Sequence, residues 1–439
     1  MAPPCQHPDM QAWKFGDTLI IFTLLFSWTE IRSRIVLESR AMKTEQILAE
    51  RGDRCRRLAQ ALVERFGPGE SPRFFRAPGR VDLMGSHTDY NQGLILAAAV
   101  DRDIIAAARL RRDGKLCCCS LNLDQEVRGS LEQLKHDPAD GWANYPKGVL
   151  FELDKLGLTL PGLDLAVHGT IPVGGNLSSS AALSVVTLTA ALKLLNQSLS
   201  PWERIHLCHR AETGFVGLPC GILDQFTVVM GRPEIALFLD CRSLEWQPVP
   251  FPSDQAGLVV ANSGVGRELV ASEYGTRVAE CKKAAEHFRR YRAQVQSLRD
   301  VNEKELEAIG PMLPEVLLRR ARHVVTENRR VEAAAGALRR GDLAELGRIM
   351  NAGYESSRDD YQISIPELDR LHAIMSESPG VLGSRIAGAG WGGCMVSLIR
   401  LEAIDLFTKR VAARYHEQTG RSLSILAVAI SGGPEEISA

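Results

Sequence analysis

Four short segments of the chain combine polar side chains with glycine in patterns that suit small-molecule chemistry. The first, Arg76–Asn91, places a cation and a backbone-bending glycine beside three polar side chains, Ser86, His87 and Asp89. Sugar hydroxyls need donors and acceptors held at fixed angles, and a loop anchored next to a strand supplies them with little entropy left to lose on binding. The segment therefore predicts a polyol-binding loop.

The second segment, Pro172–Leu183, carries two adjacent glycines followed by a run of Ser and Ala that opens a helix. Glycines let backbone N–H groups close on an anion, and a helix N-terminus carries positive partial charge. No Lys–Ser/Thr pair follows the glycines, so this is not a Walker loop, and charge neutralisation must come from a metal ion and the backbone. We interpret the segment as a phosphate cradle; the start of an ordinary core helix is the alternative.

Two further segments lie downstream. Gly388–Cys394 has four glycines in six residues before a strand-like run, which indicates a backbone that approaches a ligand or another loop closely; a tight turn is the alternative. Cys220–Phe226 places Asp224 among apolar neighbours. A carboxylate there is either structural or held for chemistry, and these residues alone leave the choice open.

Taken in the order in which they follow along the chain, the four segments resemble the galactokinase branch of the small-molecule kinases named for galactose, homoserine, mevalonate and phosphomevalonate (GHMP). The resemblance runs from about Phe74 to the end of the chain and includes Trp142–Gly148 and Arg358–Tyr361. It implies an α+β fold of two lobes, an N-terminal ribosomal-S5-like lobe and a C-terminal ferredoxin-like lobe, with the active site between them. It also implies an ATP-dependent sugar-1-kinase that makes galactose 1-phosphate and ADP.

The resemblance implies a role for individual residues. Asp224 falls where the family has its catalytic Asp, which faces the anomeric hydroxyl, and Arg80 falls beside it. Ser180 and Glu212 match the positions that hold the Mg²⁺ bridging the β- and γ-phosphates of ATP, an oxygen-ligand set that a hard cation prefers. The matched sugar-binding residues are Ser86, His87, Thr88, Asp89 and Tyr274. The matched nucleotide-binding residues are Gly174, Gly175, Asn176, Leu177, Ser178, Ser179 and Ser180.

Departures from the family pattern bear on the substrate. Ser86 stands where galactokinases usually have Glu, and that Glu is expected near the C6 hydroxyl of the sugar. Serine can bond that hydroxyl but also tolerates a C6 carboxylate or a pentose lacking C6. Galactose is favoured, with galacturonate and L-arabinose as rivals. The other departures are Asp82 for Asn, Asn176 for Gly, and Ala387 for Thr or Ser.

A second class of function is a catalytically silent relative that binds sugar and ATP and signals through a protein partner. Such sensors can lack part of the Ser-Ala stretch, which is complete here in Ser178–Ala182, and Asp224, Glu212 and Arg80 are present. The enzyme reading is therefore favoured. A mevalonate- or homoserine-type kinase is disfavoured because its substrate is not a sugar, and the predicted polyol-binding residues Gly85–Asn91 would then bind nothing.

Composition agrees with a globular enzyme. The 439 residues are 45% hydrophobic and 24% charged, which suffices for two or three domains, and the net charge of −1 argues against a nucleic-acid partner. The ten cysteines show no paired spacing for zinc, so we expect reduced thiols in the cytoplasm. We expect a monomer whose partner is a small sugar, without membrane association.

The elements that must position these residues follow from periodicity. We expect lobes over residues 42–240 and 241–439. Residues 1–41 contain an apolar run too short to span a bilayer, which needs roughly 20 residues. We expect them to be a disordered or non-native extension before Met42. Helices are expected over residues 45–66, 144–156, after Ser180, 201–213, 272–292 and 316–340. The last of these is expected to end at Gly341, and a further helix to begin at Asp342. Strands are expected over residues 74–81, 93–100, 104–122, 235–240, 258–263, 384–386, 395–399 and 424–429.

Overall fold

The computed structural model of the chain describes residues 48–172, 177–218, 220–265 and 270–439. The chain divides into two compact units, Met1–Asp53 and Arg54–Ala439, and the second contains both β-sheets. The extension predicted over residues 1–41 lies outside the described residues, as do Gly174, Gly175 and Asn176 of the predicted phosphate cradle.

The first sheet is built around one long strand, β2(Leu94–Leu110). It pairs antiparallel with β1(Arg73–Met84) along most of its length, with β5(Leu163–Gly169) over its second half and with β6(Ile235–Asp240) at its start. Within the described residues the sheet has eight strands, ordered β12-β1-β2-β5-β3-β4, with β6 pairing β2 and β7 pairing β6. The shorter strands are β3(Lys115–Ser120), β4(Gln125–Ser130), β7(Trp246–Pro250) and β12(Glu435–Ile437).

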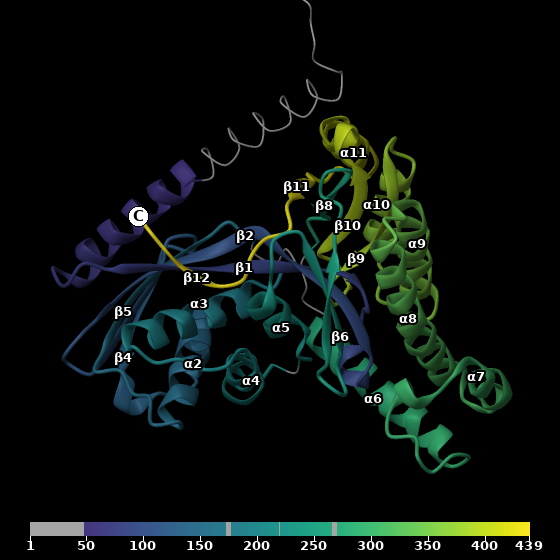
Figure 1. The fold of residues 1–439 in the computed structure, drawn as a ribbon, viewed down its shortest axis with the longest axis horizontal. Coiled ribbons are helices and arrows are strands. Elements are labelled where there is room, and N and C mark those ends of the chain that lie inside the picture. Colours follow the sequence, from purple (N-terminus) through teal and green to yellow (C-terminus); the bar gives the residue numbers. More distant parts are fainter. Residues whose placement is uncertain (1–47, 173–176, 219, 266–269) are drawn as a thin grey trace, which may run out of the picture. The chain divides into compact units, whose positions relative to one another are not determined.

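Apolar side chains cover both faces of this sheet because successive residues of a strand point to opposite sides. Ala106 and Ala108 of β2 belong to the large core beneath the helices, whereas Ile105 and Ala107 pack with Leu58 of the helix that includes residues 54–66. In Figure 1 that helix lies on one side of β1 and β2, and the other helices of this region lie opposite. These are α2(Asn144–Asp154), α3(Ser179–Leu194), α4(Pro201–Arg210) and α5(Leu223–Met230).

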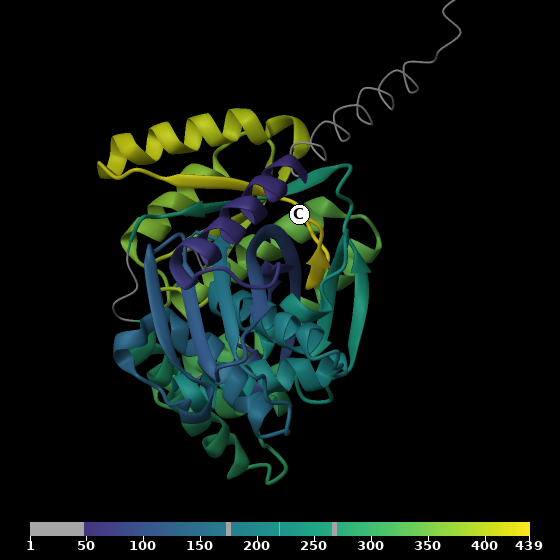
Figure 2. The ribbon, with the colours of Figure 1, turned by 90° about the vertical axis from the view of Figure 1, so that its left-hand side faces the viewer.

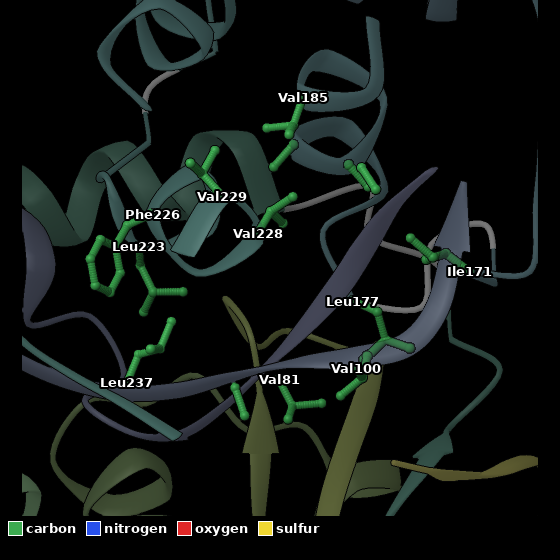
Figure 3. Packing of buried hydrophobic residues seen from close by; sticks show 14 of the residues in the cluster. Val81, Val100, Ile171, Leu177, Val185, Leu223, Phe226, Val228, Val229 and Leu237 are labelled. Atoms are coloured by element: carbon green, nitrogen blue, oxygen red, sulfur yellow. The ribbon is translucent and has the colours of Figure 1, made fainter. Parts of the chain in front are cut away.

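The large core fixes the positions of α3 and α5. Figure 3 shows Val185 of α3 and Val228 of α5 on one side of the long strands, whereas Val81 of β1 and Val100 of β2 point to the other side; all four side chains are fully buried. Each such side chain contributes roughly 1.5–3 kcal/mol when it is removed from water. The N-termini of both helices are thereby anchored beside the last residues of β1.

The second sheet has strands β8(Ala256–Asn262), β9(Val381–Ala387), β10(Cys394–Arg400) and β11(Ser424–Val428), which pair antiparallel in the order β11-β8-β10-β9. In Figure 2, α11, in yellow, lies alongside β11. The helices in this part of the chain are α6(Val270–Arg289), α7(Glu303–Ile309), α8(Glu315–Arg339), α9(Leu343–Asp359), α10(Pro366–Ser376) and α11(Ile404–Thr419). None of the described helices is long and apolar enough to cross a lipid bilayer.

The structure confirms the predicted α+β class and most of the predicted elements. One prediction was wrong: a break between strands near residue 101 does not exist, because β2 runs unbroken through Asp101–Asp103. The polar triplet stays in the strand since Asp103 pairs with Arg54 and Arg76 at 2.7 and 2.6 Å. The sequence prediction also gave no range for β4, β5, β7, β12, α5, α7, α10 or α11. The lobe boundary near residue 240 stays a prediction; β12, at the end of the chain, returns to the first sheet.

Candidate active site

One cavity of about 400 Å³ brings the predicted functional segments together. It lies between elements of the first sheet and elements that belong to the second, because its walls come from the β1–β2 loop, α3, α5, α6 and the β9–β10 loop. The predicted site residues that line it are Arg80, Ser86, His87, Asp89, Ser180, Glu212, Asp224 and Tyr274.

The loop after β1, residues 85–93, is closed by its own backbone contacts. Gly85 has a φ of 100°, and a Cβ there would lie 2.6 Å from the carbonyl oxygen of Leu94, so only glycine fits. The Thr88 hydroxyl bonds to the carbonyl oxygens of Gly85 and Leu94 at 2.8 and 2.6 Å. Thr88 is fully buried and does not line the cavity, so its hydroxyl serves the shape of the loop.

Helix α8 holds this loop from outside the cavity. The buried Glu327 carboxylate accepts hydrogen bonds from the backbone N–H groups of Gly85 and Ser86 at 2.9 and 3.3 Å. His323 Nε2 lies 3.1 Å from the Ser86 carbonyl oxygen, which places an imidazole N–H on that acceptor. Although burial opposes its charge, the Arg385 and Arg330 guanidinium groups hold the pKa of Glu327 well below its usual range. Sequence motifs gave no signal for this contact.

Ser86 presents a small polar group to the cavity. It is 3% exposed, and its Oγ has no hydrogen-bond partner among the described residues. A buried hydroxyl without a partner costs free energy unless a ligand supplies one. A serine hydroxyl without a protein partner is suited to a hydrogen bond with a substrate group at this position.

Asp89 lies directly against the segment that carries Asp224. A Cβ on Gly221 would lie 1.6 Å from Asp89 Oδ2, so glycine at 221 makes room for the carboxylate. Burial, with the nearby Asp224 and Asp82 carboxylates, raises the pKa of Asp89 to about 6. The first and fourth segments therefore meet in space, as the sequence predicted.

The Asp224 carboxylate has both oxygens engaged. Arg80 Nη2 and Nε lie 2.6 and 2.8 Å from Oδ1, and the Ser178 hydroxyl donates to Oδ2 at 2.5 Å. Asp224 stands in the first turn of α5, and Ser178 immediately precedes α3 with a left-handed φ of 56°. Oδ2 accepts only the Ser178 bond among these contacts and keeps a second lone pair, so the group can still accept a proton or hydrogen bond from a ligand hydroxyl.

Glu212 lies in a π-helical turn, η4(Ala211–Val216), that widens the end of α4; such turns are frequent at functional sites. Burial first, and then the nearby Asp224 carboxylate, raises the pKa of Glu212 to about 7. Ser180 and Gln225 donate hydrogen bonds to it, the latter at 2.8 Å. A buried carboxylate and a hydroxyl beside a second carboxylate suit a divalent cation with oxygen ligands.

The glycine-rich β9–β10 loop closes another wall of the cavity. The Gly388 N–H donates to Asp82 Oδ2 at 2.8 Å, and Asp82 Oδ1 lies 3.5 Å from Arg80 Nε. A Cβ on Gly390 would lie 2.5 Å from the Ile363 carbonyl oxygen, which explains the need for glycine at that position. This loop is thus tied through Asp82 to the cation that holds Asp224.

The described part of the predicted nucleotide segment starts at Leu177. The Leu177 side chain is buried in the core, and its backbone carbonyl oxygen accepts a hydrogen bond from the backbone N–H of Arg80 at 3.1 Å. Ser179, the exposed first residue of α3, and Ser180 present the positive end of a 16-residue helix, which suits an anion. Ser178 instead directs its hydroxyl to Asp224.

Sequence reasoning gave no site role to several residues that line the cavity, among them Tyr145 and Cys220. Tyr145 lies in the Trp142–Gly148 stretch that supported the family resemblance, and Cys220 opens the segment that contains Asp224. Position within those segments was the available signal. Among the described residues, no group of three or more His, Cys, Asp or Glu side chains could hold a metal ion.

Three family models match the chain. The galactokinase galactose-binding signature matches residues 60–110, the GHMP kinases N terminal domain matches residues 144–232, and the GHMP kinases C terminal domain matches residues 334–417. The galactokinase of Roseiflexus sp. (strain RS-1) is 42% identical over 358 residues, which cover 82% of this chain and 91% of that protein. The Bos taurus galactokinase is 38% identical over 83% of this chain and 93% of that protein.

Solved structures agree. The Lactococcus lactis galactokinase complexed with galactose has a TM-score of 0.82 and 33% identity, covering 87% of this chain and 99% of that chain. The Methanococcus jannaschii mevalonate kinase, at 18% identity and a TM-score of 0.59, shares the fold alone and covers 83% of this chain. From these relatives and the signature that spans residues 85–93, hereafter the sugar loop, the chain belongs to the galactokinase family of GHMP kinases, which are phosphotransferases acting on a sugar hydroxyl.

Proposed function

We propose that the protein transfers the γ-phosphoryl group of ATP to the anomeric hydroxyl of galactose. The observation that carries this proposal is the position of Asp224, which shares one cavity with the sugar loop and with the N-terminus of α3. A sugar oxygen that contacts Asp224 would lie beside the region where a phosphate fits, so little motion separates the reactants.

Asp224 would accept the anomeric proton, or orient the hydroxyl, as its oxygen attacks phosphorus. Arg80 and Ser178 fix the carboxylate so that it needs no reorganisation. Although burial opposes its charge, the Asp224 and Asp82 carboxylates raise the pKa of Arg80, which keeps a cation available for charge that develops during transfer.

Ser180 and Glu212 would hold Mg²⁺ when ATP is bound. The support is the set of oxygen ligands itself. Burial and the neighbouring Asp224 carboxylate raise the pKa of Glu212 to about 7, and a divalent cation beside Glu212 would stabilise its charged form and lower that pKa. When bound, the ion would supply charge neutralisation on the phosphates. The residues of the chain supply position: Gln225 orients Glu212 through its amide.

The charge of the cavity bears on the choice of sugar. Four of its described lining residues are carboxylic acids, Asp82, Asp89, Glu212 and Asp224, against one guanidinium group from Arg80. Such a lining opposes a sugar that itself carries a negative charge, so it favours a neutral sugar over galacturonate. L-arabinose is neutral and remains the second candidate because Ser86 leaves room near C6. The sensor function is the remaining alternative.

The test is ADP release from purified protein with Mg-ATP and one sugar at a time: galactose, galacturonate, L-arabinose or N-acetylgalactosamine. We expect the highest kcat/KM with galactose and background release with galacturonate. Absence of ADP with every sugar, while calorimetry detects binding of both galactose and ATP, would support the sensor instead.

A further inference from the structure

Both ring nitrogens of His87 already have protein partners. Nε2 lies 2.9 Å from the carbonyl oxygen of Ala389, and Nδ1 lies 2.9 Å from the hydroxyl of Tyr90. A carbonyl oxygen can only accept, so Nε2 must carry a hydrogen. Burial lowers the pKa of His87 to about 4, which leaves the ring neutral at pH 7 and makes Nδ1 an acceptor.

This tautomer sets the direction of a buried hydrogen-bond chain. Tyr90 must donate its hydroxyl hydrogen to Nδ1, so its oxygen accepts from Tyr361, 2.6 Å away. Tyr361 in turn accepts from the Cys281 thiol at 3.1 Å. Burial raises the pKa of Cys281 to about 11 and those of both tyrosines well above their ordinary value, so every member keeps its hydrogen at neutral pH.

This chain of hydrogen bonds joins segments that are distant in sequence. Cys281 comes from α6, Tyr361 follows α9, His87 and Tyr90 belong to the sugar loop, and Ala389 belongs to the glycine-rich loop. Ala389 itself lines the cavity. Of these residues, His87 has a left-handed φ of 61°, a conformation that costs free energy for a side chain of this size and persists only where surrounding contacts enforce it.

We propose that His87 is a positioning residue, whose Nε2–H tautomer is fixed by Tyr90 and Tyr361 and holds the glycine-rich loop against the sugar loop, rather than a ligand that donates or accepts through its ring nitrogens at the sugar. This departs from the role that family resemblance gives to His87. Its kinetic consequence rests on the proposed function, whereas the tautomer itself does not.

The direct test is ¹⁵N NMR of the full chain labelled at histidine, with the His87 signals assigned from a His87→Gln variant. The proposal expects a protonated Nε2 and an unprotonated Nδ1 at pH 7, with both signals unchanged when galactose is added. A protonated Nδ1, or a shift of either nitrogen on addition of galactose that indicates a new partner, would overturn it. No kinase activity is needed for this measurement.

Kinetics supply an independent readout. Tyr90→Phe leaves a buried acceptor without its donor, so we expect the KM for galactose to rise roughly tenfold while the KM for ATP stays unchanged. Tyr291→Phe, at an exposed tyrosine, is the matched control. His87→Gln retains an N–H that can reach Ala389 and should keep a lower galactose KM than His87→Asn. Equal galactose KM values for Tyr90→Phe and Tyr291→Phe would contradict the proposal. A wild-type protein without activity would instead refute the proposed function.

Discussion

Arg80 directs two nitrogens at one oxygen of Asp224, with Nη2 and Nε at 2.6 and 2.8 Å from Oδ1. The second oxygen accepts from Ser178. The carboxylate is thus held by one residue from the first sheet, which borders the sugar loop, and one from the start of α3, where we propose that phosphate binds. Its orientation is built into the fold before any ligand enters.

The first prediction concerns Asp224→Asn. The amide keeps the shape but loses the basic oxygen, so we expect kcat to fall by roughly 10²–10⁴-fold with the affinity for ATP nearly unchanged. Steady-state kinetics and calorimetry of ATP binding measure the two effects. An unchanged kcat would remove Asp224 from the mechanism.

Ser86→Glu tests the substrate prediction. An added carboxylate can accept from a C6 hydroxyl, which L-arabinose lacks, so we expect the ratio of kcat/KM for galactose over L-arabinose to rise at least roughly tenfold. Ser86→Ala, which only removes the hydroxyl, is the control. If both variants give the same sugar profile as the wild type, Ser86 does not face C6.

Glu212→Gln separates stability from function. A folded-state pKa of about 7, above the ordinary value near 4.5, means that the folded protein binds more protons than the unfolded chain between these pH values. Stability therefore falls as pH rises through this window. The glutamine of the variant carries no buried charge at pH 8. We therefore expect the free energy of unfolding of the variant to exceed that of the wild type by roughly 1–3 kcal/mol at that pH.

Urea unfolding at pH 8 and pH 4.5 measures this difference, which should vanish at the lower pH. The same variant should lose most Mg-ATP-dependent activity. A variant that is less stable than the wild type at pH 8 would show that the Glu212 charge is compensated in the free protein.

Glu327→Gln tests the contact between α8 and the sugar loop. The change leaves the Arg385 and Arg330 guanidinium groups without their buried carboxylate, so we expect a loss of about 3–5 kcal/mol in the free energy of unfolding. The galactose KM should also rise. Glu332→Gln, at an exposed position of the same helix, should change stability by less than about 0.5 kcal/mol. Similar effects of the two substitutions would argue against a structural role for Glu327.

Much of the fold followed from hydrophobic pattern, and the candidate site residues followed from the family resemblance that the four segments carry. The predicted meeting of Asp224 with the sugar loop is confirmed by the cavity they share. Glu212 was identified only through resemblance, because in sequence it resembles an exposed helical charge; its burial depends on the packing of η4 against α2 and on the contact with Gln225 of α5.

Other features depended on long-range contacts that local sequence does not encode. The Asp101–Asp103 triplet resembles a turn until Arg54 and Arg76 are placed beside it. Likewise, nothing around Glu327 signals that it binds the backbone of a loop 241 residues away. The exposed strands β4 and β7 lack the apolar alternation that marks buried strands.

The central claim is that the protein transfers a phosphoryl group from ATP to the anomeric oxygen of a neutral sugar bound in this cavity. Phosphorus NMR of the product from galactose and Mg-ATP tests it most directly, because the coupling of phosphorus to the sugar proton identifies the esterified position. We expect galactose 1-phosphate with the wild type and background signal with Asp224→Asn. Phosphate on another oxygen, or equal product from the two proteins, would contradict the account.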